Sequence, residues 1–151
     1  MQEIKNIALI AHDARKCDLT EWVSYNVGIL RRNNLICTGT TGQLVQSVFD
    51  DLCPEAGKVV QRLNSGPLGG DQQVGAMIVN DQIDILVFFT DPMSMQPHDV
   101  DIKALLRISS IDNIVVATTK STADFVISSP MFNSHYQPVK TNYEGYVKRL
   151  C

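Results

Sequence analysis

A glycine-rich stretch of this 151-residue sequence places a carboxylate beside groups that could bind an anion. The stretch covers residues 64–76 and reads Asn-Ser-Gly-Pro-Leu-Gly-Gly-Asp-Gln-Gln-Val-Gly-Ala, leading into a predicted helix. Glycines let the backbone approach a ligand closely, and a helix N-terminus presents unpaired N–H groups to an anion. Ser65 and Gly66 are therefore candidate phosphate-binding residues, with Asp71 as a candidate acid or base beside them. We take this pairing as the centre of a candidate active site.

Asp71 itself has two competing interpretations. It could be the N-cap of a helix over residues 72–80, because aspartate is a favoured N-cap residue. It could instead be a general base, although helix N-terminal donors stabilise a charged carboxylate and should lower its pKa. A base weakened in this way needs a partner that polarises a substrate carbonyl. His98 could be that partner as a neutral imidazole donor, or it could be an ordinary surface loop histidine.

A second candidate phosphate site is the run Thr38-Gly39-Thr40-Thr41, with three hydroxyls and several N–H groups at the start of a predicted helix. The alternative is that Thr41 is only the N-cap of that helix. The run lacks the GxxxxGK[ST] pattern, so binding of a nucleoside triphosphate has little support. Lys16 could neutralise the same phosphate, or it could be a solvated side chain.

The elements that must position these residues alternate between strand and helix. Strands are expected over residues 4–11, 35–38, 58–63, 83–89 and 114–117, the third of them near a sheet edge. A helix is expected after each strand, the last of these capped by Ser121, and a short helix is expected over residues 142–149. This alternation predicts an α/β fold with three α/β/α layers, a doubly wound, mainly parallel five-stranded sheet, and a single domain over residues 1–151.

In such folds, ligands bind beyond the carboxyl ends of the strands, at a switch point in strand order. The candidate residues occur at these positions in the sequence: His12, Asp13 and Lys16 after the first strand, Thr38 to Thr41 after the second, Ser65, Gly66 and Asp71 after the third, and Asp91 and His98 after the fourth. We therefore expect them to converge on one site.

Composition excludes several other classes of function. A formal charge of −3 and a pI near 5.5 argue against a nucleic-acid surface. No apolar run suggests a signal peptide or approaches the ~18 residues of a membrane span. The cysteines (Cys17, Cys37, Cys53 and Cys151) form no CxxC pair, which indicates reduced thiols in a cytoplasmic protein, and Cys17 lacks a motif that would make it a nucleophile. The three histidines have no metal-ligand spacing, so no metal site is expected.

Four ordered motifs closely resemble the methylglyoxal synthase family. They are Ala11-His12-Asp13 with Lys16, Thr38-Gly39-Thr40-Thr41-Gly42, the run from Ser65 to Gln73, and Asp91-Pro92 with Pro97-His98-Asp99; Ala117-Thr118 and the run from Thr122 to Phe125 also match. The resemblance extends over nearly the whole chain, departing from the family in the short termini and in residues 50–60. It implies an enzyme that eliminates phosphate from dihydroxyacetone phosphate (glycerone phosphate) through an enediolate, giving methylglyoxal and phosphate without a cofactor or metal.

The resemblance also implies roles for individual residues. Asp71 matches the catalytic acid/base, and His98 matches the histidine that binds the substrate oxygens and can shuttle a proton. The substrate- and phosphate-binding positions correspond to His12, Lys16, Thr38, Gly39, Thr40, Thr41, Ser65 and Gly66, and further acidic residues around the site correspond to Asp13, Asp91 and Asp101. Family members are typically cytoplasmic, allosteric homohexamers of a glycolytic bypass, inhibited by phosphate. Arg149 is the candidate for their intersubunit arginine.

Two other functions remain alternatives. A ligand-sensing domain, like the regulatory domain of carbamoyl phosphate synthetase, would bind an anion without turnover, although phosphate binding alone needs neither Asp71 nor His98. A phosphoacceptor receiver domain would use acidic residues after the first strand and Lys120 after the fifth. It also requires an aspartate at the end of the third strand, where this chain has Asn64 and Ser65.

Overall fold

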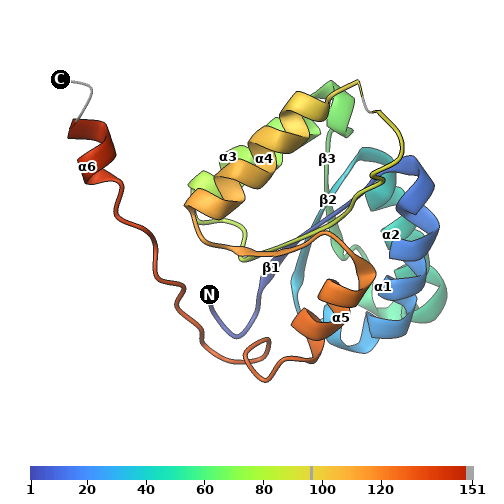
Figure 1. The fold of residues 1–151 in the computed structure, drawn as a ribbon. Coiled ribbons are helices and arrows are strands. Elements are labelled where there is room, and N and C mark those ends of the chain that lie inside the picture. Colours follow the sequence, from blue (N-terminus) through green and yellow to red (C-terminus); the bar gives the residue numbers. More distant parts are fainter. Residues whose placement is uncertain (96, 149–151) are drawn as a thin grey trace.

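The protein is built on a five-stranded parallel sheet (Figure 1). The computed structural model describes residues 1–95 and 97–148. The strands are β1 (Asn6–Ala11), β2 (Asn34–Thr38), β3 (Val60–Leu63), β4 (Ile85–Phe89) and β5 (Val115–Ala117), in the order β3-β2-β1-β4-β5. All neighbouring pairs are parallel, which confirms the predicted sheet and the edge position of its third strand. A receiver domain has the order 2-1-3-4-5, so the topology contradicts that alternative.

Helices cover both faces of the sheet. They are α1 (Lys16–Leu30), α2 (Gly39–Leu52), α3 (Gly70–Val79), α4 (Asp99–Ile111), α5 (Lys120–Ser128) and α6 (Glu144–Val147). Figure 1 shows α1, α2 and α5 on one face and the pair α3 and α4 on the other, so the three-layer prediction is confirmed. In the described part of the chain, none of these helices has the length and apolar content to cross a membrane.

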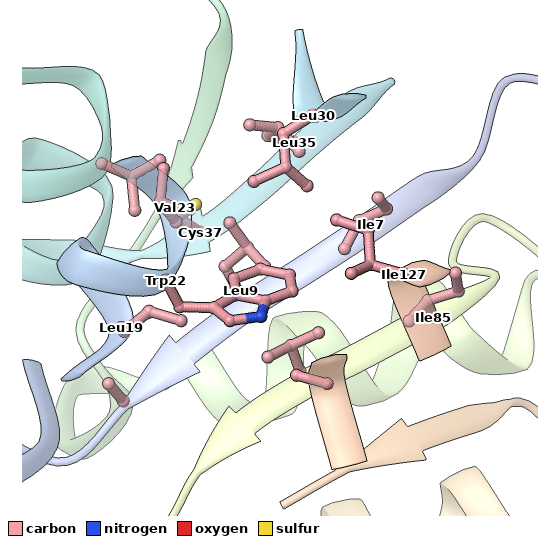
Figure 2. Close-up of a cluster of buried hydrophobic side chains, with 14 of the residues drawn as sticks. Ile7, Leu9, Leu19, Trp22, Val23, Leu30, Leu35, Cys37, Ile85 and Ile127 are labelled. Atoms are coloured by element: carbon pink, nitrogen blue, oxygen red, sulfur yellow. The ribbon is translucent and has the colours of Figure 1, made fainter. Parts of the chain in front are cut away.

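The alternating side chains of β1 supply both halves of the core. Ile7 and Leu9 belong to a buried cluster on the side of α1, α2 and α5, whereas Ala8 and Ile10 belong to a second cluster with α3 and α4. Figure 2 shows the first cluster, with Trp22 of α1 against the central strands. A strand covered on both faces has no polar alternation, which explains its continuous apolar sequence.

Two of the predicted helix caps are wrong. The residue at the N-cap position of α2 is Thr38, because the helix begins at the next residue, and Thr41 is instead buried in the first turn. The N-cap of α5 is Thr119, whose hydroxyl accepts a hydrogen bond from the Thr122 N–H at 3.2 Å, and Ser121 lies inside the helix. In both cases two hydroxyl residues lie within three positions of each other, and the sequence alone does not show which of them is the cap.

Strands β1, β3 and β4 each begin two residues later than predicted. For β3 the reason is a side chain of α2. The Gln46 Oε1 accepts hydrogen bonds from the N–H groups of Val59 and Val60, both at 3.1 Å, and the sheet ladder starts only at Val60. Boundaries of this kind depend on a tertiary contact that local sequence does not report.

The segment after α5 passes the amino-terminal ends of the strands. Buried Lys5 donates from Nζ to the Ser134 carbonyl at 2.6 Å, and the Asn113 amide donates to the Val139 carbonyl at 2.9 Å. Beyond these contacts, α6 lies apart from the sheet and its covering helices (Figure 1). It is shorter than the helix predicted over residues 142–149, and Arg149 lies outside the described residues.

Candidate active site

A cavity of about 290 Å³ lies at the carboxyl ends of the strands, where the strand order reverses between β1 and β4. Its lining consists of Ile10, Ala11, His12, Asp13, Lys16, Thr38, Thr40, Thr41, Ser65, Gly66, Pro67, Asp71, Phe88 and His98. Most of these were predicted site residues, brought together as expected. Ile10, Ala11 and Phe88 were not predicted as site residues, because their apolar strand context indicated core positions. Pro67 was not predicted either, since it has no side-chain group that could do chemistry.

One end of the cavity has the character of an anion site. The Lys16 Nζ donates to Asp13 Oδ1 at 2.5 Å and to the Thr40 hydroxyl. The hydrogen bond from Lys16 lowers the pKa of Asp13 below its usual range. Thr38 and Thr41 are buried beside them, at the start of α2. Because the first N–H groups of a helix have no intrahelical acceptors, they add to the positive potential of the lysine.

Two glycines permit close packing around the cavity. Gly39 has φ +24°, and a Cβ there would lie 2.8 Å from the Ser65 Cα. A Cβ on Gly66 would lie 2.9 Å from His98 Nε2 and 3.0 Å from Asp71 Oδ2. Gly39, which is not among the residues lining the cavity, thus brings the two candidate phosphate loops together, and Gly66 leaves room for the carboxylate and the imidazole.

Asp71 does not cap α3, so this alternative is wrong. The helix begins at Gly70 with Gly69 at the N-cap position, which places Asp71 in the first turn. Loop carbonyls accept from donors at this helix start: Gly70 N–H donates to Ser65 O at 2.9 Å, and Gln73 N–H donates to Gly69 O at 3.1 Å. Neither oxygen of the buried Asp71 side chain has a hydrogen-bond partner within the described residues.

The expected low pKa of Asp71 is also wrong. Burial raises the pKa of this carboxyl above its ordinary value; His98 and His12 act against the rise, and the charge of Asp101 adds to it. His98 Nε2 lies 3.4 Å from Asp71 Oδ2, within ion-pair distance but without hydrogen-bond geometry. Desolvation is therefore the dominant effect on Asp71, and the carboxylate is a stronger base than the sequence indicated.

His12 is held by the turn after β4. Its Nδ1 accepts a hydrogen bond from the Asp91 main-chain N–H at 2.8 Å, and its ring packs edge-on against Phe88 with centroids 5.1 Å apart. Burial, and secondarily His98, lower the pKa of His12. The Asp91 carboxylate accepts from the N–H of Met93 at 3.0 Å, so Asp91 contacts the site through its backbone rather than its side chain.

Asp101 approaches Asp71 from α4. It is not part of the cavity lining described above, but Asp71 and Asp101 both line a smaller cavity of about 190 Å³ between α3 and α4. Its position explains its contribution to the raised pKa of Asp71. Across residues 1–95 and 97–148, no group of three or more His, Cys, Asp or Glu side chains is arranged to hold a metal ion.

Comparison with known proteins identifies the family. The family model described as MGS-like domain matches residues 20–118. The methylglyoxal synthase of Maridesulfovibrio salexigens is 48% identical over 155 aligned positions, covering 99% of both chains. The chain belongs to the methylglyoxal synthase family. The methylglyoxal synthase of Proteus mirabilis is 50% identical over 95% of this chain and 90% of its own. The crystal structure of methylglyoxal synthase from Elizabethkingia anophelis NUHP1 superposes with a TM-score of 0.87 at 50% identity, covering 99% of this chain and 93% of that one.

Unpaired polar atoms single out the inner end of this methylglyoxal synthase family site. Buried side-chain nitrogen and oxygen atoms without a hydrogen-bond partner number five in the described part of the chain. Four of them are His12 Nε2, both oxygens of Asp71, and His98 Nδ1. Because buried polar groups are nearly always paired, this concentration points to groups that await a substrate.

Proposed function

We propose that this protein eliminates phosphate from dihydroxyacetone phosphate, giving methylglyoxal and inorganic phosphate. The observation that carries the proposal is Asp71, a buried carboxylate whose pKa is raised and which faces His98 at 3.4 Å. Its oxygens accept no hydrogen bond from residues 1–95 or 97–148. The opposite end of the same cavity holds Lys16 and the start of α2, which suit a phosphate. A base at one end and an anion site at the other match a three-carbon phosphate ester.

Proton abstraction is the first step. Asp71 takes a proton from the hydroxymethyl carbon, and the C–H electron pair forms a carbon–carbon double bond while the carbonyl oxygen becomes an enediolate oxygen. A raised pKa makes Asp71 a better base than an exposed aspartate. His98 stabilises the developing oxyanion by donating a hydrogen bond, and such preorganised donors are often the largest catalytic contribution.

Elimination of phosphate follows. The hydroxyl on the deprotonated carbon gives its proton to His98, and its O–H electron pair forms the aldehyde carbonyl. The carbon–carbon π pair shifts to form a double bond to the carbon bearing the phosphate, whose C–O bond breaks, and phosphate leaves with that electron pair. This requires the C–O bond to stand roughly perpendicular to the enediolate plane, so that it overlaps the π system. Lys16 and the N-terminal donors of α2 neutralise the growing charge on phosphate. The enolate product then takes up a proton on its terminal CH2 carbon, and its oxygen becomes the ketone carbonyl of methylglyoxal.

The direct test is a turnover assay combined with a binding assay. Wild-type protein incubated with dihydroxyacetone phosphate and a metal chelator is expected to produce methylglyoxal. Asp71→Asn should lower kcat by about 10³-fold, within the range for loss of a general base, while still binding inorganic phosphate by calorimetry. Wild-type protein that binds phosphate but makes no methylglyoxal would instead support the sensor alternative.

Further properties of the family enter the same proposal. We propose one domain over residues 1–151, a homohexamer in which Arg149 serves a neighbouring subunit, and a cytoplasmic role in a glycolytic bypass. Phosphate, as the leaving group, would compete for the anion end of the cavity and act as a product inhibitor, with allosteric coupling between subunits. The exposed tail helix α6, with Tyr146 68% exposed, is compatible with an intersubunit contact.

A further inference from the structure

Two apolar side chains bound the inner end of the cavity, the end that His12, Asp71 and His98 line. They are Ile10 of β1 and Phe88 of β4, which are partners in the parallel ladder between these strands. Both are buried, with 4% and 0% of their surface exposed, and both nevertheless line the cavity. We call this pair the apolar floor. It lies where the strand order reverses, the position at which sheets of this kind bind ligands.

The apolar floor adjoins the chemical groups of the site. The ring of Phe88 packs edge-on against the ring of His12, with centroids 5.1 Å apart and an interplanar angle of 80°. Ile10 and Phe88 also share a buried cluster with Val74 of α3. Val74 comes three residues after Asp71, and both belong to the buried side of that helix. The floor therefore lies beside the base and one imidazole.

The two ends of the cavity orient the substrate relative to the floor. Lys16 and the start of α2 suit the phosphate at the opposite end, so the hydroxymethyl carbon lies at the inner end with Asp71. A substituent on this carbon would lie at the inner end too. Ile10 and Phe88 offer it no hydrogen bond, and close-packed side chains make room for an added group only at a cost. The cavity volume of about 290 Å³ leaves little spare space.

We infer that Phe88 and Ile10 are specificity-determining residues that limit the elimination to ketone phosphates with an unsubstituted hydroxymethyl carbon. This inference rests on the proposed function. One added methylene in an apolar pocket commonly changes enzyme specificity by about 10–200-fold, so two side chains are sufficient. Phe89 is a matched control, because it is the next residue of β4, packs against Trp22 in the other cluster and does not line the cavity.

The methyl homologue of dihydroxyacetone phosphate, in which a methyl group replaces one hydrogen of the hydroxymethyl carbon, tests the role of the floor. The same steps apply to it: Asp71 takes the remaining C–H proton, the hydroxyl gives its proton to His98, the C–O bond to phosphate breaks, and the enolate takes up a proton. The products are diacetyl and phosphate. We expect a wild-type kcat/KM about 10²-fold lower for the homologue than for dihydroxyacetone phosphate. Both enantiomers are assayed, because Asp71 removes a proton from one face only.

Phe88→Leu and Ile10→Val enlarge the cavity at the floor. Each should narrow the ratio of the two kcat/KM values by about 10-fold, whereas Phe89→Leu should leave the ratio unchanged. The ratio does not depend on the amount of folded enzyme, so a merely structural role of Phe88 or Ile10 would not change it. Ratios that stay at the wild-type value in both floor variants would refute the inference. A wild-type enzyme that uses both substrates equally well would refute it too.

Binding measurements separate this inference from the reaction itself. Calorimetry with Asp71→Asn compares the affinities of the two compounds without turnover, and we expect weaker binding of the methyl homologue. Adding Phe88→Leu to this variant should narrow the difference. Equal affinities for Asp71→Asn would refute the role of the floor, even if methylglyoxal is formed. Absence of methylglyoxal from wild-type protein would refute the reaction, while the binding comparison would still show whether the floor excludes the methyl group.

Discussion

Burial shifts the pKa values of two residues in this cavity in opposite directions. It raises the pKa of Asp71, which strengthens a base, and lowers the pKa of His12, which keeps a donor neutral. The motifs in the sequence were sufficient to predict most of the polar residues that meet here. They could not predict that Asp71 lacks hydrogen bonds to nearby N–H groups. Those N–H groups donate to the carbonyls of residues 65 and 69 instead, and this depends on the loop conformation rather than on residue type.

The raised pKa of Asp71 predicts how stability and activity change with pH. The pKa of Asp71 in the folded state lies above the ordinary value of 3.8. The free energy of unfolding should therefore fall as pH rises from 3.8 through the folded-state pKa, and the charged carboxylate should destabilise the fold at neutral pH. Asp71→Asn should therefore raise Tm at pH 7.5, with the gain disappearing toward pH 4. In the wild type, kcat/KM should fall as pH drops through the pKa of Asp71, since the base must be ionised. Calorimetric scans of both proteins check the first point, and equal Tm values at pH 7.5 would contradict it.

Gly66→Ala tests the close approach of base and imidazole. The new Cβ would lie within 3.0 Å of both Asp71 Oδ2 and His98 Nε2, so one of them must move. A displacement of this size should lower kcat by roughly 10²-fold without unfolding the protein. Gly28→Ala on α1 is the control, because a Cβ there meets nothing within 4 Å and should stabilise the helix by about 0.5–1 kcal/mol. Unchanged kcat in Gly66→Ala would show that the cavity is looser than described.

At the scale of elements, the site depends on how edge strand β3 is held. It pairs with β2 along one edge only, and Gln46 of α2 accepts hydrogen bonds from the N–H groups at its start. Strand and helix order followed from hydrophobic periodicity. The starts of strands and helices were less predictable, because Gln46 competes with the sheet for two N–H groups and Thr119 competes with Ser121 for the cap of α5.

Replacing Gln46 should weaken the edge of the sheet. Gln46→Ala removes an acceptor for two N–H groups and the donor that reaches the Gly57 carbonyl at 3.0 Å. Leaving these groups without partners should cost about 1–3 kcal/mol of unfolding free energy. Gln43→Ala, at an exposed position of the same helix, should change stability by less than about 0.5 kcal/mol. Urea denaturation measures the stability of both variants, and indistinguishable midpoints would show that Gln46 does not stabilise the edge of the sheet.

At the scale of the whole molecule, helix α6 lies away from the sheet and its covering helices (Figure 1). Lys140 Nζ contacts Asp112 at 3.1 Å, so the segment before α6 is anchored, and Tyr143 and Tyr146 of the tail are exposed. Periodicity predicted a short helix here but said nothing of its place, because a helix of this length takes its position from contacts outside itself. The proposed hexamer supplies such contacts.

Mixed oligomers test whether Arg149 serves a neighbouring subunit. Arg149→Ala and Asp71→Asn should each lower activity by at least 10-fold when assayed alone. Mixing them in equal amounts under conditions of subunit exchange should restore about a quarter of wild-type activity, because a site is complete only when it draws Asp71 from one variant and Arg149 from the other.

A matched mixture controls for this result. His98→Gln mixed with Asp71→Asn should recover nothing, since both residues belong to the same chain's site. Sedimentation showing only monomers at micromolar concentration, or no recovery despite demonstrated exchange, would exclude the intersubunit role of Arg149.

Elimination of phosphate from dihydroxyacetone phosphate is the central claim, and an NMR time course tests it most directly. Proton and phosphorus spectra of the substrate with wild-type protein and a metal chelator report both products in one sample. We predict that methylglyoxal and inorganic phosphate grow together in a ratio of one to one, and that Asp71→Asn produces neither at a comparable rate. Substrate that binds and persists unchanged, or that becomes glyceraldehyde 3-phosphate without releasing phosphate, would contradict the account.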